Sequence, residues 1–110
     1  MLNVVVITCL FMVLDVVTGF SQACKTKTVS STVMRDGLYH KLGFIGVIIL
    51  GVLCEYAEYY VNLGFSLPLV IPICSFICWT EIVSIRENLK ILAPELSADA
   101  FTEFFKKNEK

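Results

Sequence analysis

Two acidic residues stand within long apolar stretches, where an ionised side chain is costly unless it is paired. Asp15 lies in the stretch LNVVVITCLFMVLDVVTGF, and Glu81 closely follows the run LPLVIPICSFICW. A carboxylate in a membrane-spanning stretch faces protein or water rather than hydrocarbon, where it can form an ion pair, bind a proton or line a wet surface. These two acids are therefore the first candidates for a functional site.

Both acids extend into a polar stripe when the sequence is placed on a helix, because side chains three and four residues apart share one helix face. The two stripes comprise Asp15, Thr18 and Gln22 in the first, and Thr80, Glu81, Ser84 and Asn88 in the second. Two helices with such stripes at matching depth can stabilise one another or line a water-filled space.

The stripes have structural as well as functional interpretations. Glu81 can pair with Arg86 or Lys90, or mark a helix end. Asp15 can pack against Lys25 or against a serine of the following loop. The functional alternatives are a water-lined surface in an oligomer and a switch that binds and releases a proton.

The other reactive side chains form no recognisable catalytic or metal-binding pattern. The single histidine, His40, has no paired carboxylate nearby in sequence, and zinc sites need closely spaced Cys and His residues. The cysteines contain no C-x-x-C pair, and most lie in apolar runs, where they act as small apolar side chains. They are Cys9, Cys24, Cys54, Cys74 and Cys78. We therefore predict no enzyme activity, no metal and no cofactor.

Composition places the chain in a membrane. Of its 110 residues 56% are hydrophobic and only 17% charged, whereas a soluble domain is about 45–50% apolar. The apolar residues form three blocks, 2–20, 42–60 and 67–85, each close to the roughly 20 residues with which a helix crosses a bilayer. The sequence predicts an all-α membrane protein with three transmembrane helices, in a membrane domain of residues 1–94. A net charge of −1 gives no indication of a nucleic-acid-binding surface.

The ends of the blocks agree with this interpretation. Pro68 and Pro72 fall in the first turns expected for the third block, where a missing N–H does least harm. Tyrosines flank the second block, as in an aromatic belt. The first block has no basic residue before Lys25, so we expect a retained span rather than a cleaved signal.

Charge differs sharply between the connecting segments. The expected loop 21–41 is basic, whereas residues 55–66 contain Glu55 and Glu58 and no base. The basic residues of the loop are Lys25, Lys27, Arg35 and Lys41. Because cytoplasmic loops are rich in Lys and Arg, we expect this loop and the basic C-terminal tail inside and the N-terminus outside.

The tail, residues 95–110, has an amphipathic pattern. Ser97 can cap a short helix in which Phe101, Phe104 and Phe105 share one face. We predict a cytoplasmic helix lying on the inner leaflet; the alternative is a soluble tail with a few phenylalanines.

Two segments carry a recognisable pattern. The stretch DVVTGFSQACKTKTVSSTVMRDGLYHKL combines an acid, Thr-Gly, a lysine-containing segment with paired serines, and Gly-Leu before Lys-Leu. The stretch EIVSIREN places a Glu two apolar residues before Ser-Ile and ends in Glu-Asn. In this order, on three apolar blocks, the motifs resemble the bacteriophage holin family that includes the clostridial toxin-secretion holins. The positions that carry the resemblance are Asp15, Thr18, Gly19, Ala23, Lys25, Ser30, Ser31, Gly37, Leu38, Lys41, Leu42, Glu81, Ser84, Ile85, Glu87, Asn88 and Pro94.

The resemblance implies a multi-pass protein of the bacterial cytoplasmic membrane that oligomerises and opens it. Its partners would be further copies of the chain and membrane lipids, with a functional link to an endolysin or to a secreted toxin. The competing interpretation is a small accessory membrane subunit of a transporter or secretion system, which would share composition, topology and polar stripes.

Overall fold

The computed structural model describes residues 1–96 and residue 106. Within residues 1–96 the chain forms three α-helices, α1 (Leu2–Thr26), α2 (Ser31–Ala57) and α3 (Val70–Leu92), followed by the short 3-10 helix η1 (Pro94–Leu96), and contains no strand. The predicted all-helical fold is therefore confirmed over this part of the chain. Apart from residues 95, 96 and 106, the predicted amphipathic tail lies outside the described residues.

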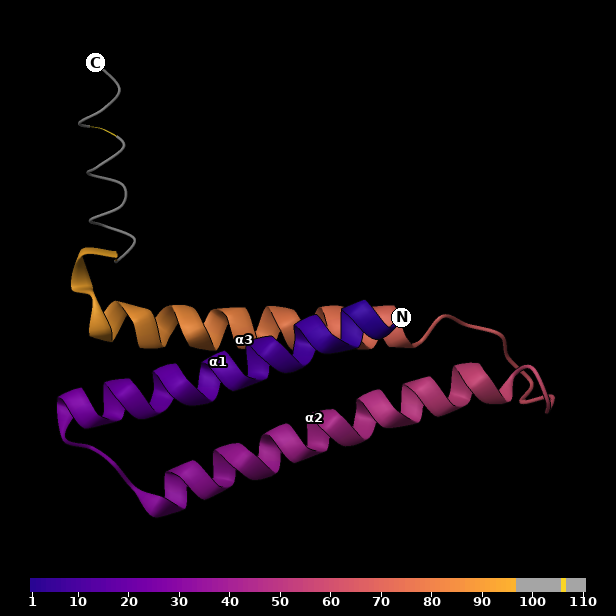
Figure 1. Cartoon of the computed structure of the whole chain (residues 1–110), viewed down its shortest axis with the longest axis horizontal. Helices are drawn as coiled ribbons and strands as arrows, with labels where there is room; N and C mark the ends of the chain where they lie inside the picture. The colour runs from indigo at the N-terminus through magenta and orange to yellow at the C-terminus, as the bar shows by residue number, and fades with distance from the viewer. Residues whose placement is uncertain (97–105, 107–110) are drawn as a thin grey trace.

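The helices run in alternating directions. In Figure 1, α1 and α3 lie side by side and point the same way, whereas α2 runs back in the opposite direction. Most packing in the molecule is between α1 and α3, and α2 contacts α3 more than it contacts α1. This arrangement brings the middle of each helix to the same region of the molecule.

The connection between α1 and α2 is much shorter than the predicted loop 21–41. Helix α1 continues to Thr26 and ends where Lys27 adopts the left-handed conformation, with φ of 58°. Helix α2 begins at Ser31, because the Ser30 hydroxyl accepts a hydrogen bond from the Val33 N–H at 3.3 Å and so caps the helix. The expectation of a loop over 21–41 is wrong for most of its length, since only residues 27–30 connect the helices.

The connection between α2 and α3 is longer than expected. Helix α2 ends at Ala57 rather than 60, and α3 begins at Val70 rather than 67. Pro68 therefore precedes the helix, whereas Pro72 lies in its first turn, where the backbone N–H has no helical partner to lose. The Glu58 carboxylate accepts hydrogen bonds from the Leu67 N–H at 3.2 Å and the Ser66 hydroxyl at 3.4 Å, which fixes the returning chain.

The apolar core is small and lies toward one end of the helices. Its buried members are Met12 of α1, Ile48 of α2, and Val70, Cys74 and Ile77 of α3. Most other large apolar side chains are exposed, on faces that point away from the other helices. They include Leu10, Val13, Val17, Leu42, Leu50, Leu53, Phe76, Trp79 and Val83. Contiguous exposed apolar surface of this extent is characteristic of contact with lipid or with another protein.

Among the residues that the structure describes, two helices are long and apolar enough to cross a membrane. These are α1 and α2. Helix α3 is more polar in its second half, where it carries Glu81, Arg86, Glu87 and Lys90. Length and composition alone thus indicate two spans.

Gly51 lies where α2 contacts α3. A Cβ atom at this position would lie 2.9 Å from Ile73 Cδ1, whereas a Cβ atom at Gly46, on the same helix, would meet nothing within 4 Å. The first glycine is thus part of a close helix contact, and the second faces open space.

We predict that Gly51→Leu lowers the stability of the detergent-solubilised chain by about 1–3 kcal/mol, because a large side chain there forces α2 away from α3. The matched control Gly46→Leu should change it by less than about 0.5 kcal/mol. Thermal unfolding followed by circular dichroism would measure both. Equal effects of the two substitutions would contradict the close packing at Gly51.

Candidate functional site

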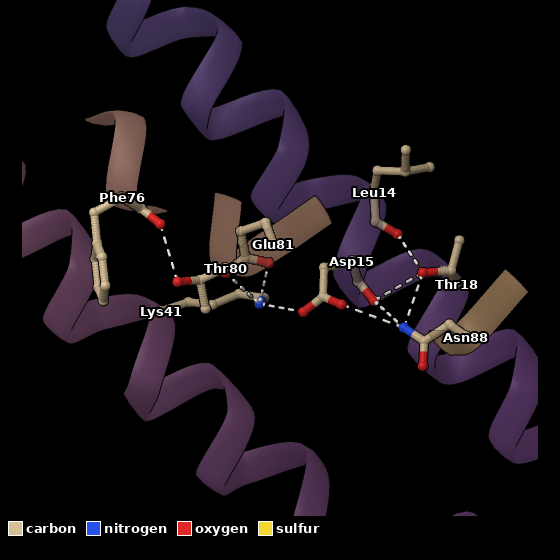
Figure 2. Close-up of polar contacts among 8 residues, drawn as sticks. All are labelled: Leu14, Asp15, Thr18, Lys41, Phe76, Thr80, Glu81 and Asn88. Carbon is tan, nitrogen blue, oxygen red and sulfur yellow. Dashed lines mark hydrogen bonds and ion pairs between the residues drawn. The ribbon is translucent and has the colours of Figure 1, made fainter. Parts of the chain in front are cut away.

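The three helices meet at an ion-pair network centred on Lys41. The Lys41 Nζ atom of α2 lies 2.6 Å from Asp15 Oδ2 of α1 and 3.0 and 3.2 Å from the two carboxylate oxygens of Glu81 of α3. Figure 2 shows the ammonium group between the two acids, with the other polar side chains extending along α1 and α3. One base thus joins two acids that lie on different helices.

The network lies deep along the helices. With a rise of 1.5 Å per residue, Asp15 and Glu81 are each about 16 Å from the ends of α1 and α3, and Lys41 is about 15 Å from the start of α2. The hydrocarbon core of a bilayer is about 30 Å thick. Charges at this depth need protein partners rather than lipid.

Asn88 and Thr18 complete the contact between α1 and α3. The Asn88 Nδ2 atom donates to Asp15 Oδ1 at 3.2 Å and to the Thr18 hydroxyl at 3.1 Å. The Thr18 hydroxyl in turn donates to the Leu14 carbonyl at 2.9 Å. Both oxygens of the Asp15 carboxylate therefore have a partner, and the position of the carboxylate is fixed from two helices.

The network is buried and holds two acids for one base. The Glu81 side chain is 2% exposed, and those of Lys41 and Asp15 are 12% and 14% exposed. Within the described part of the chain, Lys41 is the only base within ion-pair distance of either acid. With all three groups ionised, the cluster has a formal charge of −1.

A cleft connects the network with the surface near the α1–α2 connection. It has a volume of about 450 Å³ and is bordered by Asp15, Lys41, Ser84 and Asn88 at its inner end. Its wall includes Gln22, Thr28 and Ser30 together with apolar side chains of α1 and α2. On the other side of the network, the core around Met12 and Ile77 is closed. Solvent thus has a path to the network from one end of the molecule.

The structure separates the predicted stripe residues into three groups. Asp15, Thr18, Glu81 and Asn88 join one hydrogen-bonded network, and Gln22 and Ser84 border the cleft. The Thr80 hydroxyl donates to the Phe76 carbonyl of its own helix at 2.9 Å and has no bond to the network in Figure 2.

The bases considered as partners of the two acids make other contacts in the structure. Lys25 donates to the Ile91 carbonyl at 2.7 Å, at the end of α3, and Lys90 pairs with Glu87 at 3.5 Å. The base that binds Asp15 and Glu81 is Lys41, which the charge pattern assigned to a cytoplasmic loop. The need of two buried acids for a nearby base could have indicated it, because Lys41 directly precedes the second apolar block.

The network consists of two carboxyl groups, one ammonium group and the side chains that bond to them. Over residues 1–96 and 106, no group of three or more His, Cys, Asp or Glu side chains is placed to hold a metal ion. What the arrangement does physically is join α2 to α1 and α3 through charged groups while keeping those groups away from the outer surface.

Apolar outer faces around an internal polar network define a small helical membrane protein. The family model of the bacteriophage holin family matches residues 1–102, so the chain belongs to the bacteriophage holin family. This family consists of membrane-permeabilising proteins rather than enzymes. No curated protein and no solved structure matches the chain.

The motif positions that suggested the family converge on this network. From the first segment, Asp15, Thr18 and Lys41 lie in it. From the second, Glu81 and Asn88 do so. Of the other motif positions, Gly19, Gly37 and Ser84 border the cleft. Glu87 is an exposed residue that pairs with Lys90.

We predict that Asn88→Leu destabilises the folded chain by about 1–3 kcal/mol, because Asp15 and Thr18 lose a buried hydrogen-bond donor. The matched substitution Asn3→Leu, at an exposed position of α1, should have little effect. Unfolding in mixed micelles of increasing SDS content would measure the difference. An Asn88→Leu variant as stable as Asn3→Leu would show that the network adds nothing to helix packing.

Proposed function

We propose that the chain is a holin that crosses the bacterial cytoplasmic membrane three times, with its N-terminus outside and its C-terminus inside. In this proposal it oligomerises and permeabilises the membrane, releasing an endolysin or assisting the export of a toxin. The observation that carries it is the combination of family membership with a buried polar network inside an apolar exterior.

Three features support three spans rather than two. Helix α3 is parallel to α1 and packs along it (Figure 1), as expected for the first and third spans of one bundle. Its central acid is paired internally with Lys41, which reduces the cost of placing α3 in lipid. Its remaining charges, Arg86, Glu87 and Lys90, lie within its last two turns, where long side chains reach the interface.

The charges at the two ends of the bundle support this orientation. Lys25, Lys27 and Arg35 lie near the α1–α2 connection, whereas Glu55 and Glu58 lie near the α2–α3 connection. The excess of Lys and Arg at the first connection favours its placement in the cytoplasm.

The small size of the chain supports assembly from many copies. Three helices enclose no channel wide enough for a folded enzyme, so a lesion of that size needs many copies around it. The exposed apolar faces of all three helices are available for contacts with lipid or with neighbouring copies. The partners of this proposal are accordingly further copies of the chain and the membrane lipids.

The activity is testable by regulated expression in a bacterium without phage genes. We expect loss of membrane potential and arrest of growth after a delay, and lysis when a cytoplasmic endolysin is co-expressed. Potential-sensitive dye fluorescence and turbidity would follow the two steps. An accessory subunit of a transporter or secretion system would be tolerated without its partners, and full viability at high membrane levels of the chain would therefore refute the holin proposal.

The topology is tested separately by reporter fusions in the two connections. A reporter fused at residue 30 should give a cytoplasmic signal, and one fused at residue 63 should give an external signal. An inside signal at both positions would exclude the three-span arrangement, whatever the outcome of the expression experiment.

A further inference from the structure

We propose that the Lys41 network is a charge-imbalanced latch that holds the closed form of the molecule and limits its lifetime. Lys41 closes the latch, while the second acid weakens it. This inference rests on the proposed function and deepens it by assigning the step that precedes lesion formation.

Helix α2 packs little against α1, and the cleft separates their facing surfaces near the α1–α2 connection. The other close contacts of α2 lie farther along the helix, where Ile48 and Gly51 meet α3. In this half of the molecule, the ammonium group of Lys41 is therefore the principal bond between α2 and the α1–α3 pair.

Asp15 and Glu81 both approach Nζ of Lys41, so two carboxyl groups lie close together around one ammonium group. Like charges in a poorly solvated site repel strongly, and a pair of acids can be held there only while the base remains between them. A neutral one-to-one pair of Lys41 with either acid would avoid this repulsion.

Opening of the molecule would expose the polar surface that lies inside the closed form. The outer faces of the helices are apolar, so a water-filled lesion needs the polar surface that the closed form keeps inside. That surface carries Asp15, Thr18, Gln22, Ser84 and Asn88 and already borders the cleft. Movement of Lys41 out of the network would separate α2 and turn this surface toward water or toward another copy.

Two substitutions in this network should therefore change the lifetime of the closed form in opposite directions. Lys41→Met leaves two acids without a base, so the closed form should open sooner. Glu81→Gln keeps an acceptor for Lys41 and leaves the neutral pair of Lys41 with Asp15 at 2.6 Å, so the closed form should last longer. If the second acid did not weaken the network, both substitutions would destabilise the closed form, because each removes an ion pair.

The test measures the delay before dye release from bacteria expressing each variant at equal membrane levels. We expect a shorter delay for Lys41→Met and a longer delay for Glu81→Gln, with the closed–open equilibrium shifted by more than about tenfold in each direction, as expected for a change in a buried charge pair. The matched controls Lys90→Met and Glu87→Gln alter a solvent-accessible pair on α3 and should leave the delay unchanged.

A second measurement does not depend on lesion formation. In detergent, the unfolding temperature of Glu81→Gln should be higher than that of the wild-type chain, and that of Lys41→Met should be lower. A Glu81→Gln variant that opens sooner or unfolds at a lower temperature than the wild type would overturn the latch, even if Lys41→Met fails to accumulate. If the wild-type chain opens no membrane, the proposed function fails, and the order of unfolding temperatures still decides whether the charge imbalance limits stability.

Discussion

The bond between Lys41 and the two acids is the constraint on which the arrangement of the helices depends. An ion pair removed from water loses much of its solvation, and its members are held only if each finds a partner of good geometry. Here one ammonium group reaches Asp15 on α1 and Glu81 on α3 at 2.6 and 3.0 Å. Because the three residues lie on three helices, satisfying the charges also fixes the rotation and the register of the helices.

The apolar exterior explains why the polar residues gather in one place. In lipid, side chains such as Leu10, Leu50 and Phe76 can face outward without penalty, and the hydrophobic effect gives little reason for helices to associate. Association then depends on close packing, as at Gly51, and on polar contacts such as that of Asn88 with Asp15 and Thr18. The small apolar core and the extended polar network are therefore both consequences of having lipid as the solvent.

Much of the fold was predictable because its signals are local. The apolar blocks predicted the three helices, and i, i+3 and i+4 spacing placed Thr18 beside Asp15 and Ser84 beside Glu81. The partner of the acids was not predictable in this way. Lys41 lies in a basic segment, and charge counting treats such a segment as a loop, whereas Ser30 caps a helix that carries Lys41 into the interior. Which base reaches two acids on other helices is a tertiary property, and the sequence alone indicates only that a base beside an apolar block, such as Lys41, is a candidate.

The same residues must serve the closed molecule and any wet assembly built from it. The described part of the chain has one extended polar surface within its helices, so a lesion lined by water has few other side chains with which to face it. A network with balanced charges would bind this surface firmly in the closed form and oppose its release. A network without a base would never bury it. In the proposed latch, one base shared between two acids lies between these limits, because it would allow the helices to pack in lipid while keeping the free energy of separating them small.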